Sequence, residues 1–129
     1  MRARDIMNQF NHNALSGTEG NVEEFLEDVK DPDGRWYRVE YRCRADGSDA
    51  TAWLRYNPWG DQGALDYLQS HLSDDGFVCL GAESSRENSP YNLAFAVARA
   101  RFWCTGYSYL RERGYAAACA AMRAVITAA

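Results

Sequence analysis

Two histidines are the side chains of this 129-residue chain whose ordinary pKa lies near neutral pH. His71 lies a few residues before Cys79, Ser84 and Ser85, so it could serve as a general base toward a thiol or a hydroxyl. Neither His71 nor His12 belongs to a known catalytic motif, and we find no phosphate loop or dinucleotide fingerprint. We therefore expect no catalytic residue and no cofactor. A small cysteine- or serine-dependent hydrolase that uses His71 is the alternative from the enzyme class.

The four cysteines are too widely spaced to form a metal-binding or redox motif: they are Cys43, Cys79, Cys104 and Cys119. No apolar leader for export precedes them, so we expect reduced thiols packed as small apolar groups in a cytoplasmic protein. We expect no metal site.

A basic and aromatic surface is the first candidate for binding. Between residues 36 and 57 the polarity alternates with a period of two, which predicts a β-hairpin. One face of this hairpin carries the polar series Trp36, Arg38, Arg42, Arg44, Trp53 and Arg55. Arginine and tryptophan on one flat surface suit a protein partner, a phosphate-bearing ligand or single-stranded nucleic acid. The alternative is a face that helices of the same chain cover, or one that is simply solvated.

An acidic segment from Glu19 to Asp33 is the second candidate, because it holds seven carboxylates and one lysine. Apolar residues at helical spacing predict a helix over 22–29. This helix would present Glu23, Glu24, Glu27 and Asp28 to a basic partner, in imitation of nucleic-acid phosphates. A solvated helix face is the alternative explanation.

Two further features of the sequence leave alternatives open. Trp59, between a proline and a glycine, could protrude as an anchor for a partner or fold back over the core. Arg99 and Arg101 lie in the most apolar predicted helix, where they must extend to solvent or pair with acids of the 22–29 segment.

These elements together predict a single domain over residues 1–129 of the α+β class, with an antiparallel hairpin and a third strand packed against helices. We expect 11–20 to be a connection, helices over 4–12, 22–29, 61–76, 90–113 and 115–127, and strands over 36–45, 50–57 and 77–80. The order is therefore α-α-β-β-α-β-α-α. The position of the third strand in the sheet stays open.

The hairpin register can be argued from charge. A four-residue loop would place Glu40 opposite Arg55 and Arg42 opposite Trp53, which favours that register. The alternative, a two-residue Asp46–Gly47 turn, would place Arg38 opposite Arg55, which is a pair of like charges.

Composition narrows the function further. The net charge of −4 disfavours direct nucleic-acid binding over the whole surface, and no apolar run is long enough to span a membrane. We expect a non-catalytic protein-binding module. A narrower hypothesis is a small acidic inhibitor of a nucleic-acid-processing complex, of the phage or mobile-element (anti-CRISPR or anti-restriction) type. Binding of single-stranded nucleic acid by the hairpin is the alternative, and opposite charges on two elements could let two copies pair.

Overall fold

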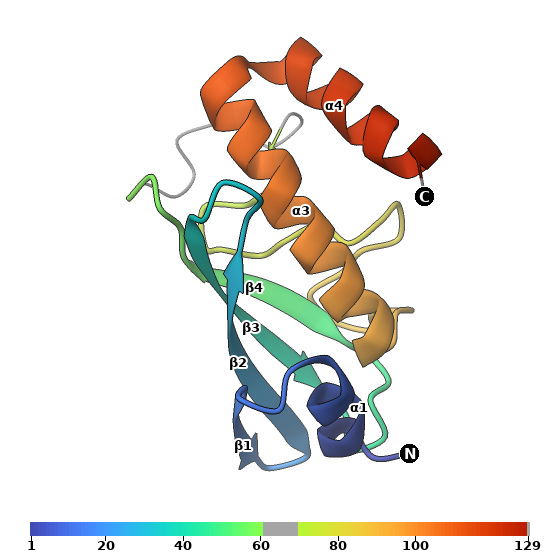
Figure 1. Cartoon of the computed structure of the whole chain (residues 1–129). Coiled ribbons are helices and arrows are strands. Elements are labelled where there is room, and N and C mark those ends of the chain that lie inside the picture. Colours follow the sequence, from blue (N-terminus) through green and yellow to red (C-terminus); the bar gives the residue numbers. More distant parts are fainter. Residues whose placement is uncertain (61–69, 129) are drawn as a thin grey trace.

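The described residues form an antiparallel sheet with helices over one of its faces. The computed structural model describes residues 1–60 and 70–128, the last four of these by their backbone alone (Figure 1). Four strands lie in the order β1-β2-β3-β4, each beside its neighbour in sequence. Their bounds are Leu15–Glu19, Val22–Lys30, Trp36–Cys43 and Thr51–Tyr56. The helices are α1 (Ala3–Phe10), α3 (Leu93–Arg113) and α4 (Tyr115–Ala128). The α+β class is confirmed, whereas the expected element order is wrong.

The main error lies in residues 15–30, where a connection and a helix were expected. These residues instead form β1 and β2, which are joined by the two-residue loop Gly20–Asn21 and paired from Glu19–Val22 to Leu15–Leu26. Along β2 the side chains alternate between the inside and the outside of the sheet, so that Phe25 and Val29 are buried. Two inward positions of β2 are occupied by Glu23 and Glu27, so the alternation of apolar and polar residues that is typical of a strand cannot be recognised in the sequence.

The β3–β4 hairpin is confirmed, but its preferred register is wrong. Glu40 lies opposite Trp53 and Arg42 opposite Thr51, which is the register of the shorter-turn alternative. A bulge between Arg38 and Val39 then sets Arg38 opposite Tyr56. The bulge removes the like-charge pair of Arg38 and Arg55 that argued against this register.

Residues 77–80, the expected third strand, lie at the free edge of β4. The backbone N–H of Val78 donates to the Ala52 carbonyl at 3.0 Å, and Phe77 forms a bridge with Trp53. The preceding residues do not continue a helix to Gly76 as expected. His71 has a positive φ of 56°, and Leu72 forms a bridge with Val78, so 71–79 is a small hairpin. The expected helix start at Asp61, with Leu65 and Leu68, lies outside the described residues.

The two C-terminal helices occur where the sequence predicts them. Helix α3 begins after Asn92, whose side chain accepts a hydrogen bond from the Phe95 N–H, so the expected cap at Ser89–Pro90 lies three residues too early. Gly114 ends α3 as expected, with a φ of 86° that favours glycine. Helix α4 packs along α3, where Met122 comes within 3.3 Å of the position that a Cβ on Gly106 would occupy.

The core lies between the sheet and α3, with α1 closing one end (Figure 1). Its largest fully buried side chains include Phe25, Tyr37, Tyr41 and Leu54 from the sheet. No helix within the described residues is long and apolar enough to cross a membrane.

A chain of hydrogen bonds runs through this layer and ends on a buried carboxylate. The Trp59 indole N–H donates to the Tyr37 hydroxyl at 3.4 Å, and this hydroxyl lies 2.6 Å from Ser108 Oγ. Ser108 in turn donates to Asp31 Oδ2 at 2.6 Å. The Asp31 side chain is fully buried and also accepts from the Arg35 backbone N–H at 2.8 Å. The chain ties α3 to the turn between β2 and β3.

Candidate interaction surface

The outer face of β2, β3 and β4 is the strongest candidate for a binding surface. On the inner face the residues of β3 are buried, whereas the outward residues of these strands other than Thr51 are exposed or half-buried. Trp36 is 51% exposed and Tyr56 is 56% exposed, although both are large aromatic side chains. Among the described elements, the helices lie on the opposite side of the sheet (Figure 1). Aromatic side chains left this accessible are typical of a surface that another molecule covers.

The arginines of this outer face are paired with acids. Arg38 binds Asp28 through two hydrogen bonds of 2.8 and 3.2 Å. Glu40 lies between two guanidinium groups, accepting from Arg42 at 2.6 Å and from Arg55 at 3.0 Å. Burial alone would raise the pKa of Glu40, but these hydrogen bonds outweigh it, and the pKa is lowered. The surface is therefore an ion-paired lattice with little excess positive charge.

Trp53 is the centre of this lattice. The guanidinium carbons of Arg42, Arg55 and Arg86 lie 5.3, 5.4 and 5.5 Å from its ring centroid. Phe77 packs edge-on at 5.1 Å. These contacts hold the indole in one orientation. Arg86 was not among the predicted residues, because its place beside β4 depends on its contacts with Asp75 and Phe77 of the 71–79 hairpin.

The remaining basic and aromatic candidates lie elsewhere. Arg44 is at the end of the outer face, with its side chain 71% exposed and 3.7 Å from Asp49. Trp59 folds back onto the core, where it contacts Tyr37 and lies beneath the Arg35 guanidinium at 4.9 Å. The alternative of a protruding Trp59 is therefore wrong. Of the predicted series, Trp36, Arg38, Arg42, Trp53 and Arg55 lie on the outer face, where Leu26 and Tyr56 join them.

The expected acidic helix face does not exist. Glu23 and Glu27 point into the protein, being 9% and 2% exposed, while Glu24 and Asp28 point outward beside arginines. Because these residues form a strand, its side chains alternate between two faces and cannot form one acidic row. The hypothesis that these carboxylates imitate nucleic-acid phosphates required a continuous acidic helix face, and the strand provides no such face.

Glu27 is instead an anchor for α3. It accepts hydrogen bonds from Arg101 at 2.7 Å, from the Tyr41 hydroxyl at 2.6 Å and from Asn11 at 3.2 Å. The expectation that Arg101 pairs with an acid of this segment is confirmed. Arg99 differs, since its guanidinium donates to the Leu80 carbonyl at 3.1 Å.

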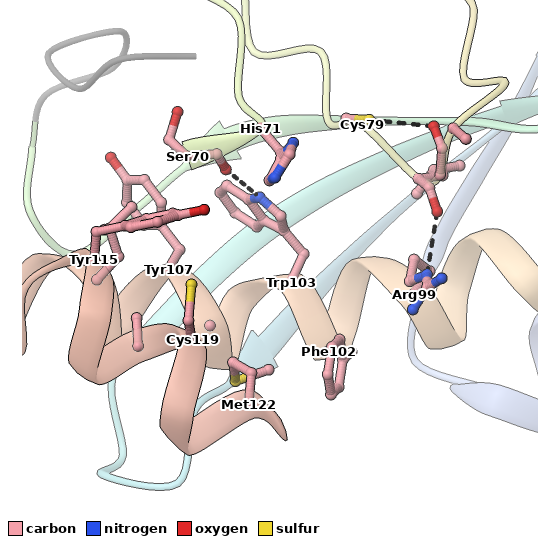
Figure 2. A pocket seen from close by; sticks show the side chains of 16 residues that line it. Ser70, His71, Cys79, Arg99, Phe102, Trp103, Tyr107, Tyr115, Cys119 and Met122 are labelled. Atoms are coloured by element: carbon pink, nitrogen blue, oxygen red, sulfur yellow. Dashed lines mark hydrogen bonds between the residues drawn. The ribbon is translucent and has the colours of Figure 1, made fainter. Parts of the chain in front are cut away.

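A hollow of about 500 Å³ lies between α3, α4 and residues 70–82 (Figure 2). Apolar and aromatic side chains dominate its lining, including Phe102, Trp103, Tyr107 and Met122. Trp103 donates from its indole N–H to the Ser70 carbonyl at 2.8 Å. These features suit an apolar occupant rather than polar chemistry.

His71 and Cys79 both line this hollow, as the hydrolase alternative requires. They face each other in the 71–79 hairpin, where the Cys79 N–H donates to the His71 carbonyl at 2.9 Å. The Cys79 thiol, however, donates to the Gly81 carbonyl at 3.3 Å (Figure 2). Ser84 and Ser85 accept from backbone N–H groups of Leu80 and Glu87, so both hydroxyls serve local turns.

All four cysteines are free thiols, two of them buried and two half-buried. Within residues 1–60 and 70–128, no group of three or more histidine, cysteine or acidic side chains could hold a metal ion.

Comparison with known protein families, with curated proteins and with solved structures finds no match for this chain.

Proposed function

We propose that this protein is a non-catalytic binding module that engages a protein partner through the outer face of its sheet. The observation that carries the proposal is the exposure of Trp36 and Tyr56 beside an ion-paired arginine lattice. Tryptophan, tyrosine and arginine are the residues that contribute most to protein–protein binding energy. The half-buried Leu26 and Trp53, on either side of Glu40, add apolar area to this face.

A protein partner fits this face better than a nucleic acid does. Phosphate binding needs arginines whose charge is available, and salt dependence follows from the number of phosphates that they neutralise. Here Asp28 and Glu40 already accept from Arg38, Arg42 and Arg55. The inhibitor role stays a prediction. The surface proposed to contact the inhibited complex is now the outer face of the sheet, with its paired acids and arginines, in place of an acidic helix.

The test uses the whole chain as bait in lysate of the organism that encodes it. The variant Trp36→Ser/Tyr56→Ser removes the two exposed aromatics. The matched control Phe95→Ser removes an aromatic that is 38% exposed on α3. We expect wild type and control to retain one protein in stoichiometric amount and the double variant to lose it. Equal retention by all three chains, or retention of nucleic acid alone, would contradict the proposal.

A Cys79–His71 hydrolase is the second candidate, because the 71–79 hairpin places these residues opposite each other beside a hollow. Its test is hydrolysis of an activated ester by wild type, Cys79→Ala and His71→Ala. Under the binding proposal all three chains give the same rate. Turnover that both substitutions abolish and that iodoacetamide blocks would establish the enzyme instead.

A further inference from the structure

Strand β1 forms one edge of the described sheet. In the described sheet, β2 is the one strand beside β1, and all five residues of β1 are exposed. Leu15 is 66% exposed. Edge strands that stay unpaired in solution are protected by a short length, by charged side chains, by proline or by a bulge. Strand β1 is five residues long and ends on Glu19, but it has no proline or lysine and pairs with β2 without a shift in register.

The register shows which backbone groups point outward from this edge. In an antiparallel pair, residues that exchange hydrogen bonds alternate with residues that do not. The Asp31 N–H donates to the Arg35 carbonyl, so odd-numbered residues of β2 bond to β3 and even-numbered ones bond to β1. Gly17 therefore bonds to Glu24 across the ladder. The N–H and C=O groups of Ser16 and Thr18 point away from β2.

We infer that two copies of this chain pair through β1, antiparallel, about a two-fold axis at Gly17. This register sets Ser16 opposite Thr18 of the second copy and uses every outward group of the strand. A shift by two residues in either direction would leave one of these residues without a partner from the strand. Self-complementarity of this kind is what a symmetric interface requires, so a second copy fits the edge.

The side chains agree with this pairing. The two Gly17 residues meet as a pair without hydrogen bonds, the closest approach that antiparallel strands make. A Cβ on Gly17 would have no atom within 4 Å in the described part of one chain, so packing there does not require glycine. Leu15 would lie opposite Glu19 of the second copy, and Ser16 opposite Thr18, so no like charges face each other. The dimer joins two sheets into one, with both outer faces on the same side.

This inference does not rest on the proposed function, and backbone substitution tests it. Ser16→Pro removes an outward N–H that the β1–β2 ladder does not use, whereas Ser16→Ala keeps it. We expect light scattering after size exclusion to give twice the chain mass for wild type and Ser16→Ala. Ser16→Pro should give the mass of one chain with an unchanged circular dichroism spectrum.

Amide hydrogen exchange of the wild type makes the test independent of any variant. Exchange at Ser16 and Thr18 should slow as protein concentration rises, while exchange at exposed loop amides should not change. A wild type that is monomeric at all concentrations, or a folded Ser16→Pro that still forms dimers, would overturn the inference. Concentration-independent exchange at both amides would overturn it as well.

Discussion

The buried carboxylate of Glu27 gives a prediction at the scale of single residues. Its side chain is fully buried and paired with Arg101. Removing one partner of such a pair leaves a charge without compensation, so Arg101→Met should lower the free energy of unfolding by about 3 kcal/mol. Arg38→Met breaks the exposed pair with Asp28 and should cost less than about 1 kcal/mol. Urea denaturation of both variants measures the difference, and equal losses would refute this assignment.

Asp31 gives a prediction about acid stability. Burial would raise its pKa, but hydrogen bonds from Ser108 and from backbone N–H groups, together with Arg35, outweigh burial and lower it. The unfolded carboxyl titrates near pH ~3.9. Its contribution to stability is therefore complete above about pH 4 and is lost as the pH falls through the lower, folded pKa.

Asp31→Asn removes this titration. We expect the free energy of unfolding of the variant to fall less steeply with acid than that of wild type, measured by urea denaturation between about pH 5 and pH 2. Asp33→Asn, at an exposed neighbour, removes one carboxylate and leaves Asp31 in place, so it is the control for the change in charge. Parallel slopes for wild type and Asp31→Asn would show that Asp31 does not titrate as described.

At the scale of elements, the turn between β3 and β4 is linked to the start of α3. Gly47 has a φ of 84°, and its carbonyl accepts from the Leu93 N–H at 2.7 Å. An added Cβ would lie 2.9 Å from Ile6 Cδ1. Gly47→Ala combines backbone strain with crowding and should cost about 2 kcal/mol. Gly60→Ala has a similar φ, but no atom of the described residues lies within 4 Å of the added Cβ, so a loss of about 1 kcal/mol is expected on denaturation. A smaller loss at Gly47 than at Gly60 would contradict this.

The strand β2 shows why part of the fold could not be predicted from the sequence. Val22, Phe25, Leu26 and Val29 have the spacing of a helix face, yet Val22 and Leu26 point outward while Phe25 and Val29 point inward. The inward acid Glu27 is compensated by Arg101, 74 residues later in the chain. A reading of local periodicity has no access to such a partner. The loop Gly20–Asn21 between two short runs is the hairpin signal that was available and unused.

Other elements were predictable because their signals are local. The strand β3 alternates throughout and β4 alternates from Ala52 to Arg55, and Gly114 ends α3 where its positive φ is needed. The outer face followed from that alternation, so Trp36, Arg38, Arg42, Trp53 and Arg55 were found together. Arg86 was missed because three-dimensional pairing of the 71–79 segment brings it to Trp53.

At the scale of the whole molecule, the thiols report on global unfolding. Burial raises the pKa of Cys43 to about 12 and that of Cys104 well above its ordinary value, whereas Cys79 and Cys119 are half-buried. A thiol reacts as its thiolate. We expect iodoacetamide to label Cys79 and Cys119 in the native protein, and all four cysteines in denaturant. Peptide mass spectrometry locates the labels, and rapid native labelling of Cys104 would contradict the described core.

The two polar anchors of α3 also determine how this helix is set against the sheet. Arg101 and Ser108 lie seven residues apart, about 10.5 Å along the axis, and bind Glu27 and Asp31, four residues apart, about 13 Å along a strand. Apolar side chains extend from α3 on nearly all sides, so burial by itself allows many azimuths of the helix. Both pairs of hydrogen-bonding groups can therefore meet at the same time in only one placement of α3 against the sheet. A shift of α3 by one helical turn would leave the Glu27 and Asp31 carboxylates without Arg101 and Ser108 at the same time. The cost of burying these two carboxylates without their partners selects a single native alignment of the helix and the sheet.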